Sequence, residues 1–190
     1  RGLGDVYKRQ IIGGKDLLNG KRFDKGGYIL TYDYDKWSFI DPKEAQKKLN
    51  LPRNPRDYTS IAVTTDDSND EIVYASSMGD GVIQYKNGTP VQSYNEKNAF
   101  KETAGGYGSG YCYIDGLAFD KNGNLWMTSS EVNHAVLVLD KAGAWHRLDI
   151  EQLRGVYTIN DILITSTNDK WIYAVSYTHL RAHETLANLV

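Results

Sequence analysis

The sequence predicts an all-β fold: a partial β-propeller of about three to four blades, each a four-stranded antiparallel sheet, arranged as an open arc. Three observations predict it. Short apolar segments alternate with turns rich in Asp, Asn and Gly, a strand–turn–strand unit recurs at a spacing of 45 residues, and a second hairpin follows each complete unit. A spacing of about 40 to 50 residues is typical of propeller blades.

The strand–turn–strand unit is clearest in two segments. Residues 116–126 (GLAFDKNGNLW) align without gaps with residues 161–171 (DILITSTNDKW), so Trp126 and Trp171 hold the same position in the repeat. Residues 60–77 form a third copy, for which we expect a longer turn. Asp, Asn and Gly favour hairpin turns because they tolerate left-handed backbone angles or bond their own main chain.

A second hairpin follows in residues 81–94 and 135–148, and residues 27–39 match this second hairpin alone. We therefore expect an outer half-blade, two complete blades and the inner half of a fourth. A β-sandwich also uses short strands joined by turns, but the recurring unit with Trp at one fixed place favours blades.

The connections between blades differ in character. Residues 41–49, with Pro42 near the start, and residues 149–154 predict short helical insertions between blades. Residues 95–113 are rich in Gly and Tyr and predict a loop.

Both ends of the chain are expected to derive from a sequencing adapter. The DNA CGTGGGCTCGGAGATGTGTATAAGAGACAG, which corresponds to a transposase library adapter, encodes residues 1–10, and its reverse complement in another frame encodes residues 175–183. We therefore assign residues 1–10 and 175–190 to adapter and residues 11–174 to the partial β-propeller. We expect residues 1–10 and 176–190 to lack a packing partner, although residues 175–178 could extend the last strand.

The amino-acid composition limits the classes of function that are open to this chain. The formal net charge is −2, and about −4 without the four basic and two acidic residues of the expected adapter ends. A mildly acidic chain with dispersed charge argues against nucleic acid as a partner, since that partner requires basic patches. The single cysteine, Cys112, excludes an internal disulfide, and no apolar stretch is long enough for a membrane span.

Chemical motifs are weak. Residues 105–110 (GGYGSG) lack the Lys-Ser/Thr of a phosphate loop, and residues 66–71 (DDSNDE) lack the spacing of an EF-hand, so a connector and a solvated turn are favoured. We predict no catalytic residues, no cofactor and no metal, because the histidines and Cys112 have no recognisable ligand or nucleophile spacing.

Residues 116–127 (GLAFDKNGNLWM) resemble the DxxGNLW blade signature of the two-component-regulator propellers of Bacteroidetes. More narrowly, the succession of residues 27–37, 81–88, 117–127 and 162–171 resembles the PorZ-type propellers of type IX secretion, over nearly all of residues 25–173. The resemblance implies an exported protein at the cell surface, outer membrane or periplasm. It also implies a C-terminal secretion domain and work with the sortase that attaches cargo to anionic lipopolysaccharide.

Alternation of strand direction places the connections after the second and fourth strands of each blade on one face, which is the better candidate for contact with a ligand or partner. The tyrosines of this face could stack on a sugar or a protein, and His134 could hydrogen-bond it; alternatively, these tyrosines cover blade edges. The candidate contact residues are Met78, Asp80, Tyr107, Tyr111, Tyr113, Glu131 and His134.

Three functions remain open. The leading hypothesis is a non-catalytic binding and assembly module of the type IX secretion and surface-attachment machinery, whose partners are proteins of a secretion or sortase complex or a glycan or lipopolysaccharide ligand. The second is a periplasmic glycan-sensing propeller of a hybrid two-component regulator. The third is a propeller hydrolase or lyase, which would need converging acids or metal ligands.

Overall fold

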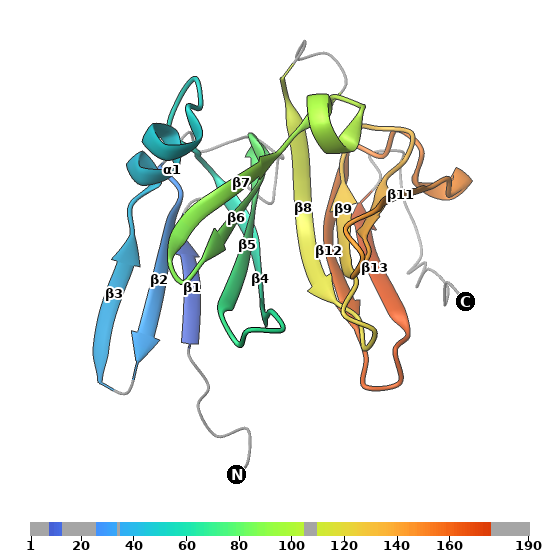
Figure 1. Cartoon of the computed structure of the whole chain (residues 1–190). Helices are drawn as coiled ribbons and strands as arrows, with labels where there is room; N and C mark the ends of the chain where they lie inside the picture. Colours follow the sequence, from blue (N-terminus) through green and yellow to red (C-terminus); the bar gives the residue numbers. More distant parts are fainter. Residues whose placement is uncertain (1–7, 13–25, 34, 105–109, 176–190) are drawn as a thin grey trace.

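The computed structural model describes residues 8–12, 26–33, 35–104 and 110–175, and it shows a row of antiparallel sheets that stand side by side as an arc (Figure 1). The strands are β1 (Lys8–Ile12), β2 (Tyr28–Asp33), β3 (Lys36–Ile40), β4 (Tyr58–Thr65), β5 (Glu71–Gly79), β6 (Gly81–Lys86), β7 (Thr89–Tyr94), β8 (Cys112–Phe119), β9 (Leu125–Ser129), β10 (Val136–Leu139), β11 (Trp145–Leu148), β12 (Thr158–Ile164) and β13 (Lys170–Val175).

The order of the strands confirms the partial β-propeller. β4–β7 and β8–β11 are two four-stranded blades, each with sequential antiparallel neighbours, and β12–β13 is the inner half of a further blade. β2–β3 is the predicted outer hairpin. The two complete blades are also joined by backbone pairing, because the end of β5 meets the start of β8 at Met78 and Tyr113.

The N-terminal strand differs from the prediction. Residues 8–12 form β1, which pairs along its whole length with β2, so the expectation that residues 1–10 lack a packing partner is wrong for Lys8, Arg9 and Gln10. The physical reason is that an open strand edge offers main-chain groups that any extended segment can bond, whatever its sequence. Residues 1–7 and 176–190, which were covered by the same expectation, lie outside the described part of the chain.

Each complete blade is apolar on both faces, as a sheet between two other sheets must be. In β5, Ile72 and Tyr74 face the β8–β11 blade, whereas Val73 and Ala75 face the sheet that contains β2. This alternation follows the period of two of a strand. The space between neighbouring blades is therefore a hydrophobic layer, repeated from one blade to the next.

The two repeat tryptophans occupy equivalent positions, as predicted. Trp126 pairs with Ala118 in β8–β9, and Trp171 pairs with Leu163 in β12–β13. Trp126 faces β12–β13, packs in the layer that contains Ile159, and has Lys170 Nζ 4.9 Å from its ring centroid. Trp171 points away from that layer and is 37% exposed.

Hairpin turns of one geometry close four of the hairpins. The four turns are residues 66–70, 120–124, 140–144 and 165–169. In each, the N–H of the first residue donates to the carbonyl of the fifth, and the carbonyl of the first accepts the N–H of the fourth. The fourth residue has a positive φ in every turn, which explains the Asn or Gly found there. The turn after β4 is therefore not longer than the others. In that repeat β5 has nine residues against five in β9, whereas β4 and β8 have eight residues each.

A bulge recurs in the inner strands β4, β8 and β12. Pairing shifts between Tyr58 and Ser60, between Ile114 and Leu117, and between Ile159 and Asp161. The bulged residues are Thr59, Asp115 with Gly116, and Asn160. A bulge turns backbone and side chains out of the ladder, which here directs them toward the neighbouring blade.

Bonds between blades start from these bulges. Thr59 Oγ1 donates to the Ile114 carbonyl at 2.6 Å. Ser130 Oγ donates to the buried Asp115 carboxylate at 2.5 Å and accepts the Ile159 N–H of the next blade at 2.8 Å. Gly116 lies so close to β12 that a Cβ there would be 2.6 Å from the backbone nitrogen of Ile162, so only glycine fits.

The connections between blades agree with the prediction in part. Helix α1 (Pro42–Leu49) follows its N-cap Asp41, whose side chain accepts the Lys43 N–H at 2.9 Å. The second insertion is a short 3₁₀ turn, η2 (Glu151–Leu153). Residues 95–113, predicted as loop, instead hold a turn of π-helix, η1 (Glu96–Phe100), whose Ala99 and Phe100 are buried against the blades.

Substitution of Ser130 tests the bonding between blades. Ser130→Ala should lower the free energy of unfolding by about 1 to 3 kcal/mol, because Asp115 loses a buried donor and the Ile159 N–H loses its acceptor. Urea denaturation followed by circular dichroism measures this. Ser129→Ala is the matched control, since Ser129 is a neighbouring buried serine whose hydroxyl takes no part in the bonds between blades described above. Equal losses in both variants would contradict the assigned role of Ser130.

Candidate functional site

The connections after β5, β7, β9 and β11 lie at the top of Figure 1 and form what we call the loop face, and the hairpin turns lie at the opposite turn face. The predicted contact residues of the loop face have different surroundings. Met78 and Tyr113 are 6% and 2% exposed and pack with Ala104 in a small cluster. The burial of Tyr113 favours the alternative in which the tyrosines cover blade edges.

Asp80 and Tyr111 lie around one arginine. Arg53 Nη2 is 2.6 Å from Asp80 Oδ1, and Arg53 Nε donates to the same oxygen at 2.8 Å. Asp80 Oδ2 accepts the Arg56 N–H at 3.1 Å. The Arg53 guanidinium also lies 5.5 Å from the centroid of the half-buried Tyr111 ring, which packs edge-on against Tyr113. Tyr107, the remaining predicted tyrosine, lies outside the described residues.

His134 belongs to a contact between the two complete blades. Its Nδ1 pairs with the Glu102 carboxylate, which comes from the connection after the β4–β7 blade. The other oxygen of Glu102 accepts the N–H groups of Asn133 at 2.8 Å and His134 at 3.3 Å. Burial opposes ionisation of Glu102, but these hydrogen bonds outweigh it and lower its pKa. Glu102 therefore holds the β9–β10 connection in place.

Among the predicted contact residues, Glu131 combines a left-handed backbone conformation with a carboxyl group whose pKa is shifted. Its φ is 62°, a left-handed conformation that is costly for a residue other than glycine, and its N–H bonds the Val156 carbonyl at 2.8 Å. Burial and the nearby Asp115 raise the pKa of Glu131. Strained backbone and perturbed carboxyl groups both concentrate at functional sites. Of the predicted contact residues, Glu131 is consequently the best candidate for a functional role.

A cleft lies on the turn face between the two complete blades, and the predicted site residues have no part in it. Its volume is about 670 Å³, within the range of about 300 to 1,000 Å³ that ligand pockets occupy. Side chains of both blades line it, together with the turns at residues 64–67, 121–123 and 140–143. We call it the inter-blade cleft.

Aromatic rings form the wall of the inter-blade cleft. Tyr74 and Tyr94 stack with centroids 6.4 Å apart, Phe119 meets Tyr74 edge-on, and Trp145 meets Tyr94 at 5.3 Å. Tyr74 is buried, and burial raises its pKa to about 12, whereas Tyr94, Phe119 and Trp145 are partly exposed. Tyr94 donates its hydroxyl hydrogen to Gln84 Oε1 at 2.8 Å.

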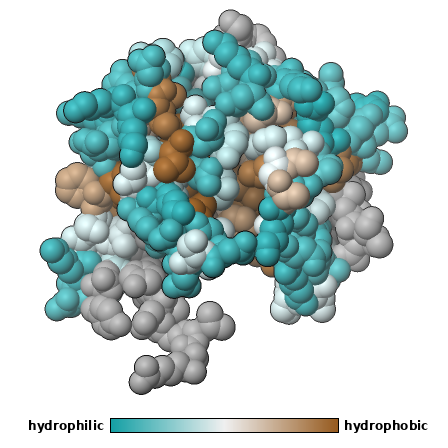
Figure 2. Space-filling model, in the orientation of Figure 1, coloured by the Kyte–Doolittle hydropathy of each residue, from teal (hydrophilic) through white to brown (hydrophobic). Residues whose placement is uncertain are grey.

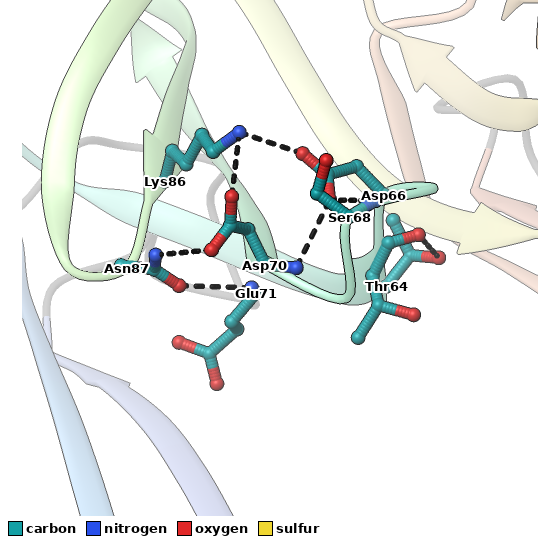
Figure 3. Close-up of polar contacts among 8 residues, drawn as sticks. Thr64, Asp66, Ser68, Asp70, Glu71, Lys86 and Asn87 are labelled. Atoms are coloured by element: carbon teal, nitrogen blue, oxygen red, sulfur yellow. Dashed lines mark hydrogen bonds and ion pairs between the residues drawn. The ribbon is translucent and has the colours of Figure 1, made fainter.

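A network of charges holds the rim of the cleft (Figure 3). Lys86 Nζ lies 2.7 Å from Asp66 and 2.9 Å from Asp70, so it bridges the two ends of the turn after β4. These contacts raise the pKa of Lys86 and lower the pKa of both carboxyl groups. Asn87 joins the network by bonding Asp70 and the Glu71 N–H. The acidic turn at residues 66–71 thus binds an ammonium group of its own chain.

The possible metal ligands and the single cysteine can be located in the part of the chain that the structure describes. There, no group of three His, Cys, Asp or Glu side chains is arranged to hold a metal ion. Cys112 is buried and free, and burial with the nearby Glu96 raises its pKa to about 12, which disfavours the reactive thiolate. No described helix is long and apolar enough to cross a membrane.

The inter-blade cleft was not predicted from the sequence. Its lining residues come from all strands of both blades. They lie too far apart in the sequence for a local pattern to connect them. The available signal was the presence of aromatic residues in the predicted blade segments, Tyr74, Phe119 and Trp145, but such residues pack in cores more often than they bind ligands.

The radial sheets, the repeated turns and the bulged inner strands define a β-propeller, of which the described residues form an arc. Among solved structures, PorZ, an essential bacterial surface component of the type IX secretion system of Porphyromonas gingivalis, is similar to this chain with a TM-score of 0.71. The identity is 22%, over 90% of this chain and 22% of PorZ.

The extracellular domain of BT4673 from B. thetaiotaomicron, described as part of a hybrid two component system, has a TM-score of 0.54 and 16% identity over 78% of this chain. This chain spans about a fifth of the length of these structures, 22% of PorZ and 20% of the BT4673 domain. No protein-family model matches the sequence, and no curated protein matches it significantly. The likeness therefore shows a shared fold.

The Glu102 contact makes stability depend on pH. The pKa of Glu102 is lower in the folded chain than its ordinary value of 4.5, so its contribution is present above about pH 4.5 and is lost as the pH falls through the folded pKa. Glu102→Gln should lower the free energy of unfolding at pH 7 by roughly 1 kcal/mol. The difference from wild type should shrink as the pH falls below about 4.5.

Urea denaturation at neutral and acidic pH measures this difference. Glu44→Gln in α1 is the matched control, because Glu44 is exposed and its change should cost less than about 0.5 kcal/mol at either pH. A Glu102→Gln deficit that stays constant down to acidic pH would show that ionisation of Glu102 does not stabilise the contact.

Proposed function

We propose that this chain is part of a non-catalytic binding and assembly module of the type IX secretion and surface-attachment machinery, which contacts its partners through the loop face. The observation that carries the proposal is that hydrogen bonds between neighbouring blades hold the connections of the loop face in place. Glu102 ties the connection of one blade to residues 133–134 of the next, and Glu131 bonds Val156 near the start of β12. A surface held in this way needs little ordering when a partner binds.

Two carboxylates of the loop face, Asp80 and Glu102, support binding over catalysis. Asp80 is held by Arg53 and a backbone N–H, and Glu102 is held by His134 and two backbone N–H groups. A general acid or base must exchange a proton with a substrate that it can reach. Carboxylates engaged in several structural hydrogen bonds are better suited to shaping a surface.

The partner and the location follow from the resemblance to PorZ-type propellers, which the fold likeness supports. PorZ is a surface component of a type IX secretion system. By analogy we assign this protein to the exported compartments, at the cell surface, the outer membrane or the periplasm. Its partners are then proteins of a secretion or sortase complex, or a glycan or lipopolysaccharide.

Charge reversal on the loop face tests this function. Glu131→Arg, introduced into the intact gene in its bacterium, should reduce the amount of secreted cargo attached to the cell surface several-fold and increase cargo in the medium. Cell fractionation measures both, with immunoblots to show equal amounts of the variant protein. Asp35→Arg, an exposed acidic residue at the β2–β3 turn on the turn face, is the matched control and should behave as wild type. Normal cargo attachment with Glu131→Arg would reject the assignment.

The fold likeness to the BT4673 extracellular domain favours one other function, a periplasmic glycan-sensing propeller of a two-component regulator. The same strains separate the two. A sensor would leave cargo attachment intact in the Glu131→Arg strain and would instead lose a transcriptional response to a glycan. A membrane span leading into a histidine kinase in the same gene would decide for the sensor.

A further inference from the structure

We propose that the inter-blade cleft is a binding site for a neutral oligosaccharide. The cleft lies on the turn face, away from the loop face, so this inference goes beyond the proposed function and does not depend on it. Both walls of the cleft belong to complete blades, β4–β7 and β8–β11. It is therefore a feature of the blade pair itself and not of the open ends of the arc.

The shape and chemistry of the wall suit a sugar ring. Tyr94 and Trp145 are partly exposed in the cleft and lie at 61° to each other, with centroids 5.3 Å apart, so they present two differently inclined aromatic surfaces. Phe100, which is buried, meets Trp145 edge-on with ring centroids 5.4 Å apart. Aromatic faces pack against the C–H faces of pyranose rings, and a rigid aromatic side chain loses little entropy when it binds.

Polar groups at the cleft are available or already positioned. Gln84, which lines the cleft, accepts from Tyr94 through its carbonyl oxygen, and this bond does not use its amide N–H groups. Lys86 is fixed by Asp66 and Asp70, and Asp140 by the Ala144 N–H and His146. A few fixed polar groups beside an aromatic surface are the usual composition of a site for a small polyhydroxy ligand.

The charge of the lining selects a neutral ligand. Three acidic residues, Asp66, Asp67 and Asp140, and three basic residues, Lys86, Lys121 and Lys141, line the cleft. This balance provides no net attraction for phosphate, sulfate or uronic acid groups, which require an excess of positive charge. A neutral sugar needs hydrogen-bond donors and acceptors of both kinds, which such a rim supplies.

The test uses the purified full chain on an array of neutral oligosaccharides built from glucose, mannose, galactose, xylose and N-acetylglucosamine, with oligogalacturonates and peptides on the same array. Calorimetry and Trp fluorescence then measure the dissociation constant of the best ligand. We expect at least one neutral oligosaccharide to bind, with an affinity that changes little between about 0.05 M and about 0.5 M NaCl, since no ion pair forms with the ligand.

Two variants remove the site in different ways. Trp145→Ala should weaken binding roughly tenfold or more by removing the stacking surface. Asn122→Trp adds bulk at the mouth from an exposed turn, leaves the core intact, and should abolish binding even if Trp145→Ala fails to fold. Trp37→Ala, at a 50% exposed tryptophan of β3 outside the cleft, is the matched control and should bind as wild type.

The outcomes separate this inference from the proposed function. Glu131→Arg should leave sugar binding unchanged, because Glu131 lies on the other face. The inference is overturned if no neutral oligosaccharide binds, if only acidic sugars or peptides bind, or if both Trp145→Ala and Asn122→Trp bind as tightly as wild type.

Discussion

The close approach of the inner strands β4, β8 and β12 is the constraint on which the arrangement of the blades depends. Each inner strand has a shift in its pairing ladder, and the bulges of β4 and β8 bring polar groups to the boundary with the next blade. Ser130 shows why this matters, because one hydroxyl joins the buried Asp115 to the backbone of Ile159. Apolar layers alone would let flat sheets slide past one another, whereas directional hydrogen bonds between bulges set their relative level.

Two surfaces with different properties follow from this arrangement. Strands that alternate in direction bring long connections to one end of every blade and tight turns to the other. At the loop face, Glu102 links neighbouring connections across a blade boundary. At the turn face, the sheets diverge and leave the inter-blade cleft, whose rim is held by Lys86 and its two carboxylates. The exposed surface in Figure 2 is mostly hydrophilic, with hydrophobic residues in small patches among polar ones.

Local chemistry allowed much of the fold to be predicted. The turn at residues 120–124 needs Asp120 to accept backbone N–H groups and Gly123 to take a positive φ, and both requirements are visible in the letters DKNGN. Asp41 and Pro42 likewise indicate the start of α1 in the sequence. By contrast, β1 could not be predicted, because its pairing with β2 uses only main-chain groups. The π-helical turn η1 was missed because Phe100 is stabilised there by the neighbouring blade.

The candidate sites likewise include features that the sequence predicted and features that depend on tertiary contacts. Alternation of strand direction was enough to place Asp80, Glu131 and His134 on one face, but burial of Met78 and Tyr113 and the pairing of His134 with Glu102 depend on neighbours far along the chain. The sequence by itself determined the strands from β2 onward, the turns and the repeat, since these depend on residues within a few positions of one another. Only the tertiary structure decided how the blades meet, and with that the inter-blade cleft, because the distance between two sheets is set by side chains that no local pattern connects.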